Sequence, residues 1–229
     1  MGRPPRITEP GLVYHLLNRR VMRLPLFQKD DDYIAFERVL AESLERPDAP
    51  GLLAWCLMPN HWHLVVDSAK GTNLSTWMQW VTVTHTHRWH AHTHTAGEGP
   101  LYQGRFKSFP VQEDAHFLTL CRYVEANALR ARLVKRAESW RWGSLWVRRS
   151  RKPALWRSVR PWPVDRPRNW LREVNRHVQE EALASIRQSV ARCVPLGSAR
   201  WKIRVANRLG LDITLRPRGR PRENTNKSS

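Results

Sequence analysis

The sequence contains little cysteine. Its 3 cysteines, at positions 56, 121 and 193, are widely spaced, and no two of them form a C-x-x-C pair. An odd number of isolated cysteines supports neither a disulfide framework nor a zinc finger. We therefore interpret Cys56 and Cys121 as small core residues.

Long apolar runs are missing as well. No uninterrupted stretch reaches the roughly 20 apolar residues that a membrane-spanning helix needs. The first residues, MGRPPRITEPG, contain no apolar core of a signal peptide. We therefore expect a cytoplasmic protein without a membrane partner.

Acidic residues are scarce relative to basic ones. The sequence has 39 lysines and arginines but only 20 aspartates and glutamates, so its formal net charge is +19. A field of this sign attracts polyanions, so nucleic acid is the expected partner and an anionic membrane surface the alternative. The 41% hydrophobic content, with 12 tryptophans, indicates a folded domain with a sizeable core.

The stretch at 52–67, LLAWCLMPNHWHLVVD, contains two histidines, His61 and His63, separated by one bulky apolar residue. On a strand, both imidazoles lie on one face with their Cα atoms about 6.5 Å apart, so they can share one metal ion. The β-branched residues that follow favour a strand, and the Met-Pro-Asn before the pair favours a turn. An isolated H-x-H also occurs by chance, so this reading needs a third ligand and a reactive group nearby.

The remaining pattern predicts alternating strands and helices. Apolar residues at three- and four-residue spacing mark the helices, and capping residues such as Asn73 and Asp114 mark where helices begin. Around the strand pair at 52–67, the pattern predicts a strand at 11–18, a helix at 30–46, a helix at 73–90, a strand at 101–111 and a helix at 115–134.

On the last of these helices, Tyr123 and Asn127 are four residues apart and therefore share a face. An asparagine can offer a carbonyl oxygen to a hard metal ion. Taken alone, a helical tyrosine is more often a core or surface aromatic than a nucleophile. We interpret Glu125 as a carboxylate that points away from Tyr123, toward solvent or DNA.

Other histidines carry weaker signals. His15 on the first strand is interpreted as a core or edge histidine, with a contribution to the active-site face as the alternative that its spacing does not support. The histidines at 85, 87, 90, 92 and 94 scatter around a helix and into a loop, so adventitious metal binding is favoured over a functional site.

Beyond Ser144 the composition changes to a mixture of Trp, Arg and Pro that predicts an extended segment. Its tryptophans either stack on unpaired bases or anchor the segment.

Helices predicted at 169–192 and 199–209 resemble a small DNA-binding unit. The tail RPRGRPR resembles an AT-hook, with non-specific phosphate attraction as the alternative. The predicted organisation is a catalytic domain at 1–145, a connecting segment at 146–168, a helical DNA-binding extension at 169–212 and a basic disordered tail at 213–229.

Five motifs together resemble the REP-associated tyrosine transposases, bacterial members of the single-tyrosine HUH transposase superfamily, where HUH denotes His, a hydrophobic residue and His. The resemblance covers 11–144, and a further match lies in LGLDITLRPRGRPR. Family members commonly have Asn-Pro and Ala-Gly after the tyrosine, whereas here Ala128 follows Asn127 and Arg132 follows Ala131. The motifs occur in family order as GLVYHLLNR, AWCLMPNHWHLVV, LYQGRFKS, RYVEANALRARLV and WRWGS.

The resemblance implies an α+β, ferredoxin-like antiparallel sheet with helices on one face. It implies that Tyr123 attacks single-stranded or hairpin DNA of palindromic repeats and forms a 5′-phosphotyrosine link. It further implies that His61, His63 and Asn127 hold Mg²⁺ or Mn²⁺, without a small-molecule cofactor. Monomer and homodimer both stay open, and a bacterial protein of this kind would join the nucleoid when bound to DNA.

Basic side chains near these motifs are the predicted DNA contacts, with solvated charge as the alternative. The rival functions are a non-catalytic DNA- or RNA-binding protein that retains the transposase fold, and an RNA-cleaving enzyme. The predicted DNA-binding residues are Arg19, Arg20, Arg105, Lys107, Arg122, Arg130, Arg216, Arg218, Arg220 and Arg222.

Overall fold

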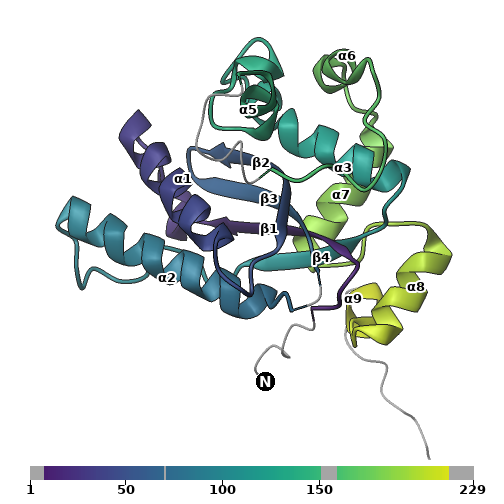
Figure 1. The fold of residues 1–229 in the computed structure, drawn as a ribbon, viewed down its shortest axis with the longest axis horizontal. Helices are drawn as coiled ribbons and strands as arrows, with labels where there is room; N and C mark the ends of the chain where they lie inside the picture. Colours follow the sequence, from purple (N-terminus) through teal and green to yellow (C-terminus); the bar gives the residue numbers. More distant parts are fainter. Residues whose placement is uncertain (1–7, 70, 151–158, 217–229) are drawn as a thin grey trace, which may run out of the picture.

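A four-stranded antiparallel sheet forms the centre of the molecule (Figure 1). The structure is a computed structural model that describes residues 8–69, 71–150 and 159–216. The strand order is β2-β3-β1-β4. The strands are β1 (Val13–Arg19), β2 (Gly51–Met58), β3 (His61–Asp67) and β4 (Lys107–Val111).

The connections explain this order. Helix α1 (Asp30–Leu44) links β1 to β2, and helix α2 (Leu74–Thr93) links β3 to β4. A tight turn joins β2 to β3, which then pairs antiparallel with both β2 and β1. β1 and β2 therefore run parallel with β3 between them, the split βαβ arrangement of ferredoxin-like folds. The predicted α+β class and antiparallel sheet are confirmed.

Both faces of the sheet are covered. Tyr14 and Leu16 pack in one core cluster with α1 and α2, whereas Val13 and Leu17 pack in a second with α3 (Ala115–Glu125) and α7 (Glu180–Arg192). Figure 1 shows α1 and α2 on one side and α3 and α7 on the other. The prediction that the helices lie on one face of the sheet is wrong. They occupy two because alternate residues of the strands are apolar in both directions.

The predicted helix starts near 30, 73 and 115 are confirmed, whereas the single helix predicted at 169–192 is two helices, one ending at Asn175 and the next starting at Glu180. Three acidic residues occupy the first turn of α1, where they complement the positive end of the helix. The Asn73 side chain caps α2 by accepting from the backbone N–H groups of Ser75 and Thr76. The fourth strand is shorter than predicted, because residues 101–106 form a loop in which Gly104 has a φ of 151°.

The C-terminal part continues this fold. Residues 146–150, predicted to be irregular, belong to a helix that starts at Ser144. Val159 forms a parallel bridge with Leu52 on β2, and Leu196 forms one with Val111 on β4. The C-terminal chain thus covers both sheet edges. The remaining elements are the helices α4 (Asn127–Arg130), α5 (Ser144–Ser150), α6 (Trp170–Asn175), α8 (Ala199–Arg208) and α9 (Asp212–Leu215) and the 3-10 turns η1 (Val21–Arg23) and η2 (Ala137–Ser139).

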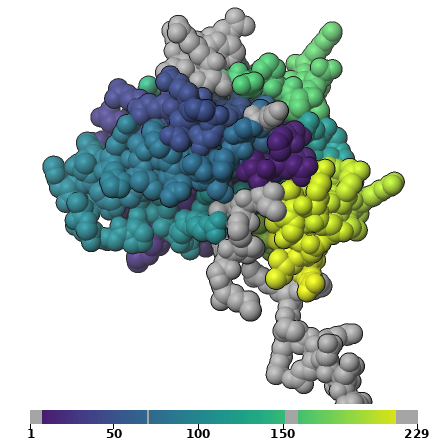
Figure 2. Space-filling view, turned by 60° about the horizontal axis from the view of Figure 1, so that its bottom comes forward, coloured from purple at the N-terminus to yellow at the C-terminus, as the bar shows by residue number. Residues whose placement is uncertain are grey.

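Helices α8 and α9 lie against the start of the described chain, and Figure 2 shows these yellow helices beside the purple N-terminal residues. Trp201 on α8 packs in a small cluster that includes Leu12. Arg208 forms an ion pair with Glu9 at 2.7 Å. Across the described part of the chain, no helix has the length and apolarity to cross a membrane.

His85 is a structural residue of the core under α1 and α2. Its Nδ1 atom is 2.7 Å from the Tyr102 hydroxyl, which also accepts a hydrogen bond from the indole of Trp62. Burial lowers the pKa of His85 to about 3. His85 is therefore a neutral, hydrogen-bonded residue of the core rather than part of a surface metal site.

We predict that His85 contributes to acid sensitivity. Between pH 6.5 and about 3 the unfolded chain binds a proton that folded His85 does not, so stability falls as pH falls. The slope attributable to one such group is up to about 1.4 kcal/mol per pH unit. In His85→Asn, whose amide can still bond Tyr102, urea unfolding between pH 6 and 4 should show a pH dependence shallower by about this slope. Equal slopes in the variant and the parent would contradict the assignment.

Candidate functional site

His61 and His63 stand side by side at the start of β3. Opposite them on β1 lie Arg19 and Leu17, and the two imidazole centroids are 5.0 Å apart. His61 Nδ1 is 2.6 Å from the side-chain oxygen of Asn60, and His63 Nδ1 is 2.9 Å from His15 Nε2. Each ring forms a hydrogen bond through Nδ1 with a neighbouring side chain, so its Nε2 atom is the nitrogen available to a metal ion.

Both rings are held neutral. Burial is the main cause that lowers the pKa of His61 to about 4, and the positive charges of Arg19 and Arg130 lower it further. Burial also brings the pKa of His63 well below its ordinary value, with His61 and His15 as the next causes. Neutral imidazole has the lone pair that a metal ion needs.

Tyr123 faces His63 from the α3–α4 corner, where Asn127 is the first residue of α4. The Tyr123 and His63 rings meet edge to face with centroids 5.9 Å apart. The prediction of a continuous helix at 115–134 was wrong. Helix α3 ends at Glu125, and the next residue, Ala126, has a φ of −86° and a ψ of 5° and separates α3 from α4. In a continuous helix the Tyr123 carbonyl would accept from the Asn127 N–H. Here the Arg130 guanidinium donates to that carbonyl at 2.5 Å.

Arg130 links the two candidate residues. Its guanidinium carbon lies 3.9 Å from the centroid of the Tyr123 ring, and its Nη2 donates to Asn127 Oδ1 at 3.0 Å. The Asn127 Nδ2 is buried without a hydrogen-bond partner among the described residues. A carbonyl oxygen has two lone pairs, so Asn127 Oδ1 can accept from Arg130 and still bind a cation.

The side chains present fit a divalent cation. Among the residues that the structure describes, no group of three or more His, Cys, Asp or Glu side chains is arranged to hold a metal. The candidate set here consists of two imidazole nitrogens and one amide oxygen. The amide oxygen is a donor that suits Mg²⁺ and Mn²⁺, whereas the imidazole nitrogens are donors more typical of transition-metal ions. The role of His61, His63 and Asn127 as ligands stays a prediction.

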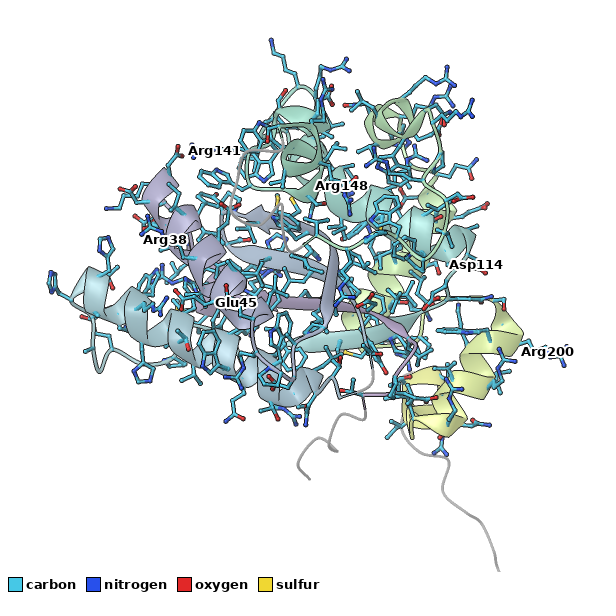
Figure 3. All side chains as sticks on the ribbon, viewed as in Figure 1. Arg38, Glu45, Asp114, Arg141, Arg148 and Arg200 are labelled. Carbon is cyan, nitrogen blue, oxygen red and sulfur yellow. The ribbon has the colours of Figure 1, made fainter. Side chains whose placement is uncertain are left out.

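Glu125 does not face solvent or DNA, which corrects the sequence interpretation. It is 3% exposed and accepts hydrogen bonds from the Ser144 hydroxyl and the Trp170 indole, each at 2.7 Å. Burial raises its pKa, and the hydrogen bonds from Ser144 and Trp170, followed by the positive charge of Arg148, oppose that rise. Figure 3 labels Arg148 beside α5. Since the partners are 19 and 45 residues away, local spacing gave no sign of them.

Several predicted DNA contacts make intramolecular bonds. Lys107 donates to the Val190 carbonyl at 3.0 Å, and Arg122 donates to the carbonyls of Arg176 and His177 at 3.0 Å each. These bonds connect α7 and the residues before it to β4 and α3. Contact of these two side chains with DNA stays a prediction.

The other basic residues are placed differently. Arg19 lies opposite His61 and interacts electrostatically with Tyr123. The Arg20 guanidinium lies 4.3 Å from the centroid of the Trp89 ring and also donates to the Pro25 carbonyl. Arg105 and Arg216 are exposed, and Arg218, Arg220 and Arg222 lie outside the described residues.

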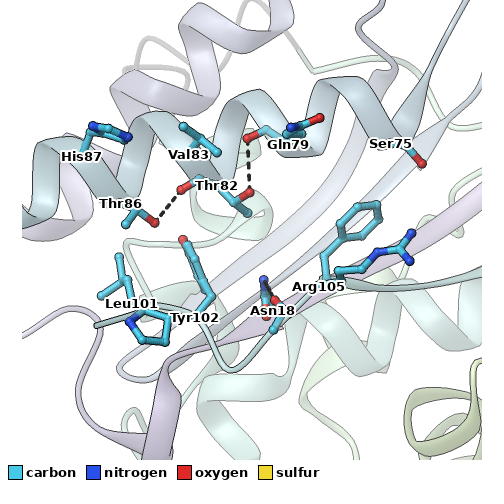
Figure 4. A pocket seen from close by; sticks show the side chains of 13 residues that line it. Asn18, Ser75, Gln79, Thr82, Val83, Thr86, His87, Leu101, Tyr102 and Arg105 are labelled. Carbon is cyan, nitrogen blue, oxygen red and sulfur yellow. Dashed lines mark hydrogen bonds between the residues drawn. The ribbon is translucent and has the colours of Figure 1, made fainter. Parts of the chain in front are cut away.

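A separate pocket of about 570 Å³ lies between α2 and the loop before β4 (Figure 4). Its wall is rich in hydroxyl and amide groups, and neither His61, His63, Tyr123 nor Asn127 lines it. The pocket and the candidate centre lie on opposite faces of the sheet because successive strand residues point to opposite sides. Asn18 faces α2 and the pocket, whereas Arg19 faces α3. The polar residues of the wall include Asn18, Ser75, Gln79, Thr82, Thr86 and Arg105.

Two further residues contact the centre: His15, for which a place on this face was the less favoured reading of the sequence, and Arg130. His15 contacts His63, and the signal was present, because odd-numbered residues of β1 share a face and His15, Leu17 and Arg19 all lie on it. Arg130 was assigned to DNA, and nothing in its spacing showed that it bonds the Tyr123 carbonyl.

Comparisons with known proteins agree with this architecture. Residues 8–127, just over half of the chain, match the family model described as "Transposase IS200 like". Among solved structures, the chain is similar to a REP-associated tyrosine transposase bound to a REP hairpin. The TM-score is 0.54 at 18% identity, over 67% of this chain and 90% of that one. At this identity the likeness shows the fold alone. No curated protein matches the chain.

We predict that Glu125 stabilises the α3–α4 corner as a hydrogen-bond acceptor rather than as a charge. In Glu125→Gln the amide can accept from Trp170 and donate to Ser144, so the free energy of unfolding at pH 7 should stay within about 1 kcal/mol of the parent. Glu125→Ala leaves both partners unpaired and a cavity, at a cost of about 3 kcal/mol. Urea unfolding measures both.

The pH dependence provides a further check on Glu125. Because its pKa is raised on folding, the parent loses stability as pH rises above the ordinary value of 4.5 toward the raised one. Glu125→Gln cannot lose a proton there and should gain stability relative to the parent over that window. A constant difference across pH would count against a raised pKa.

Proposed function

This chain belongs to the IS200-like transposase family, and from that premise we propose that it nicks and rejoins single strands of hairpin-forming DNA with Tyr123 as the nucleophile. The observation that carries the proposal is the meeting of the Tyr123 ring with His63 on one side and the Arg130 guanidinium on the other. A non-catalytic binding protein has no need of this combination.

The proposed step is a transesterification. Tyr123 Oη attacks the phosphorus of a phosphodiester and forms a new P–O bond, while the bond to the 3′-oxygen of the preceding nucleotide breaks. The phenol loses its proton and the departing 3′-oxygen gains one, so the exchange conserves charge. The products are a 5′-phosphotyrosine and a free 3′-hydroxyl, which can reverse the reaction on another strand.

The neighbouring charges support a phenol in this role. Phenols are weak nucleophiles at neutral pH unless nearby cations favour the phenolate. Arg130 and Arg19 both interact electrostatically with Tyr123, and both would attract the scissile phosphate. His61, His63 and Asn127 would hold Mg²⁺ or Mn²⁺, which when bound polarises the phosphate and offsets charge on the leaving oxygen.

We extend the substrate class of the solved relative, a REP hairpin, to this chain. The net charge of +19 suits a polyanion whose binding weakens with salt. Tyr123 contacts His63 of its own chain, which supports a reaction that a monomer can complete.

We predict that Tyr123→Phe abolishes the covalent adduct. A labelled hairpin oligonucleotide, incubated with the parent and Mn²⁺, should give a protein–DNA band that survives denaturation. The variant should give none, because it has no nucleophilic oxygen, while its hairpin affinity stays within about threefold of the parent, because phosphate contacts dominate affinity. An undiminished adduct in the variant would exclude Tyr123. No adduct with the parent would favour the non-catalytic alternative, and an RNA hairpin in parallel tests the RNA one.

Metal dependence gives a second prediction. EDTA should stop adduct formation by the parent, and added Mn²⁺ should restore it. His61→Ala should lower the adduct yield at limiting Mn²⁺ by about 10-fold or more through the lost ligand, with hairpin binding in EDTA unchanged as the control. Full activity in EDTA would rule out the metal role.

A further inference from the structure

His15 lies beneath the candidate centre and has no part in the proposed function so far. It is 0% exposed and faces α3 from β1. Its Nε2 atom is 2.9 Å from His63 Nδ1. The two ring planes differ by 12° and the centroids are 5.0 Å apart. The rings are thus joined edge to edge by an in-plane hydrogen bond.

The surroundings of His15 are otherwise apolar. Its ring packs against Phe109, with centroids 4.9 Å apart, and Val65 lies opposite it on β3. Its Nδ1 atom has no hydrogen-bond partner among the described residues. Within that part of the chain, His63 is therefore the polar group with which His15 interacts.

One proton lies in the hydrogen bond between His63 Nδ1 and His15 Nε2. A neutral imidazole has one N–H and one lone pair. If the proton is on His63 Nδ1, then His63 Nε2 offers a lone pair and His15 Nε2 accepts. If it is on His15 Nε2, then His63 carries its own proton on Nε2 and cannot bind a cation. The first arrangement alone is competent for a metal.

We propose that His15 is a positioning residue that accepts the Nδ1 proton of His63 and so presents the His63 Nε2 lone pair to the divalent cation. The proposal rests on the proposed function, because it assumes that His63 is a ligand. Metal-bound histidines generally donate their second N–H to an acceptor that fixes tautomer and ring orientation. A neutral imidazole performs this task here without adding a charge.

Two variants of similar length separate this role from simple packing. Glutamine at position 15 offers an oxygen acceptor about where Nε2 lies, and methionine offers none of comparable strength. Both are made in the Tyr123→Phe background, so that no cleavage occurs. Electron paramagnetic resonance of free Mn²⁺, with a palindromic hairpin oligonucleotide present, gives the dissociation constant. We expect H15M to weaken Mn²⁺ binding about 10- to 100-fold and H15Q about threefold or less. Hairpin affinity in EDTA and Tm serve as controls.

The outcomes are distinct. Mn²⁺ binding by H15M equal to that of the Tyr123→Phe parent, or H15Q as weak as H15M, overturns the role of His15 while the metal centre stands. A Tyr123→Phe parent that binds no Mn²⁺ overturns the centre itself. Should H15M fail to fold, nitrogen-15 NMR of the Mg²⁺-loaded Tyr123→Phe protein decides. A proton on His63 Nδ1 supports the proposal, and a proton on Nε2 overturns it.

Discussion

The pairing of β1 with β3 is the constraint on which the rest of the structure depends. Its register sets Leu17 opposite His63 and Arg19 opposite His61. Because successive residues face opposite sides, this register directs both histidines toward α3 and sends Trp62 into the core under α1 and α2. A slip of one residue would exchange the two sets. The placement of the polar centre is therefore a consequence of apolar burial on both faces.

The C-terminal half stabilises the corner that carries Tyr123. Glu125 bonds Ser144 and Trp170, and Arg122 bonds two carbonyls that follow α6. Lys107 fastens α7 to β4 in the same manner. Part of the positive charge thus serves intramolecular contacts, so the formal charge of +19 overstates what is free to meet DNA. Removing the C-terminal half would expose the second core as well as remove basic residues.

Local patterns predicted the fold well and the centre in part. Periodicity and capping gave α1, α2, β2 and β3, because these depend on neighbours in sequence. The break after Glu125 was not predicted, because it involves the Arg130 bond to the Tyr123 carbonyl, and no periodicity encodes a side chain that replaces a helical N–H. Glu125 was misread for a similar reason, since its partners come from α5 and α6. The contact of His15 with His63 was readable from strand parity once the strands were paired.

The charges around the candidate centre would make the binding of the proposed cation and of DNA cooperative. His61, His63 and Asn127 contribute no negative charge, whereas Arg19 and Arg130 lower the pKa of His61 and would repel a divalent cation in the same way. A DNA phosphate between the cation and the two arginines would neutralise this repulsion and supply oxygen ligands to the cation. Bound cation should then raise the affinity of the protein for DNA, and bound DNA should raise its affinity for the cation, by the same factor, as linkage requires. Arg130, which bonds Asn127 Oδ1 in the free protein, is the residue through which this coupling would act, because a phosphate would attract the same guanidinium.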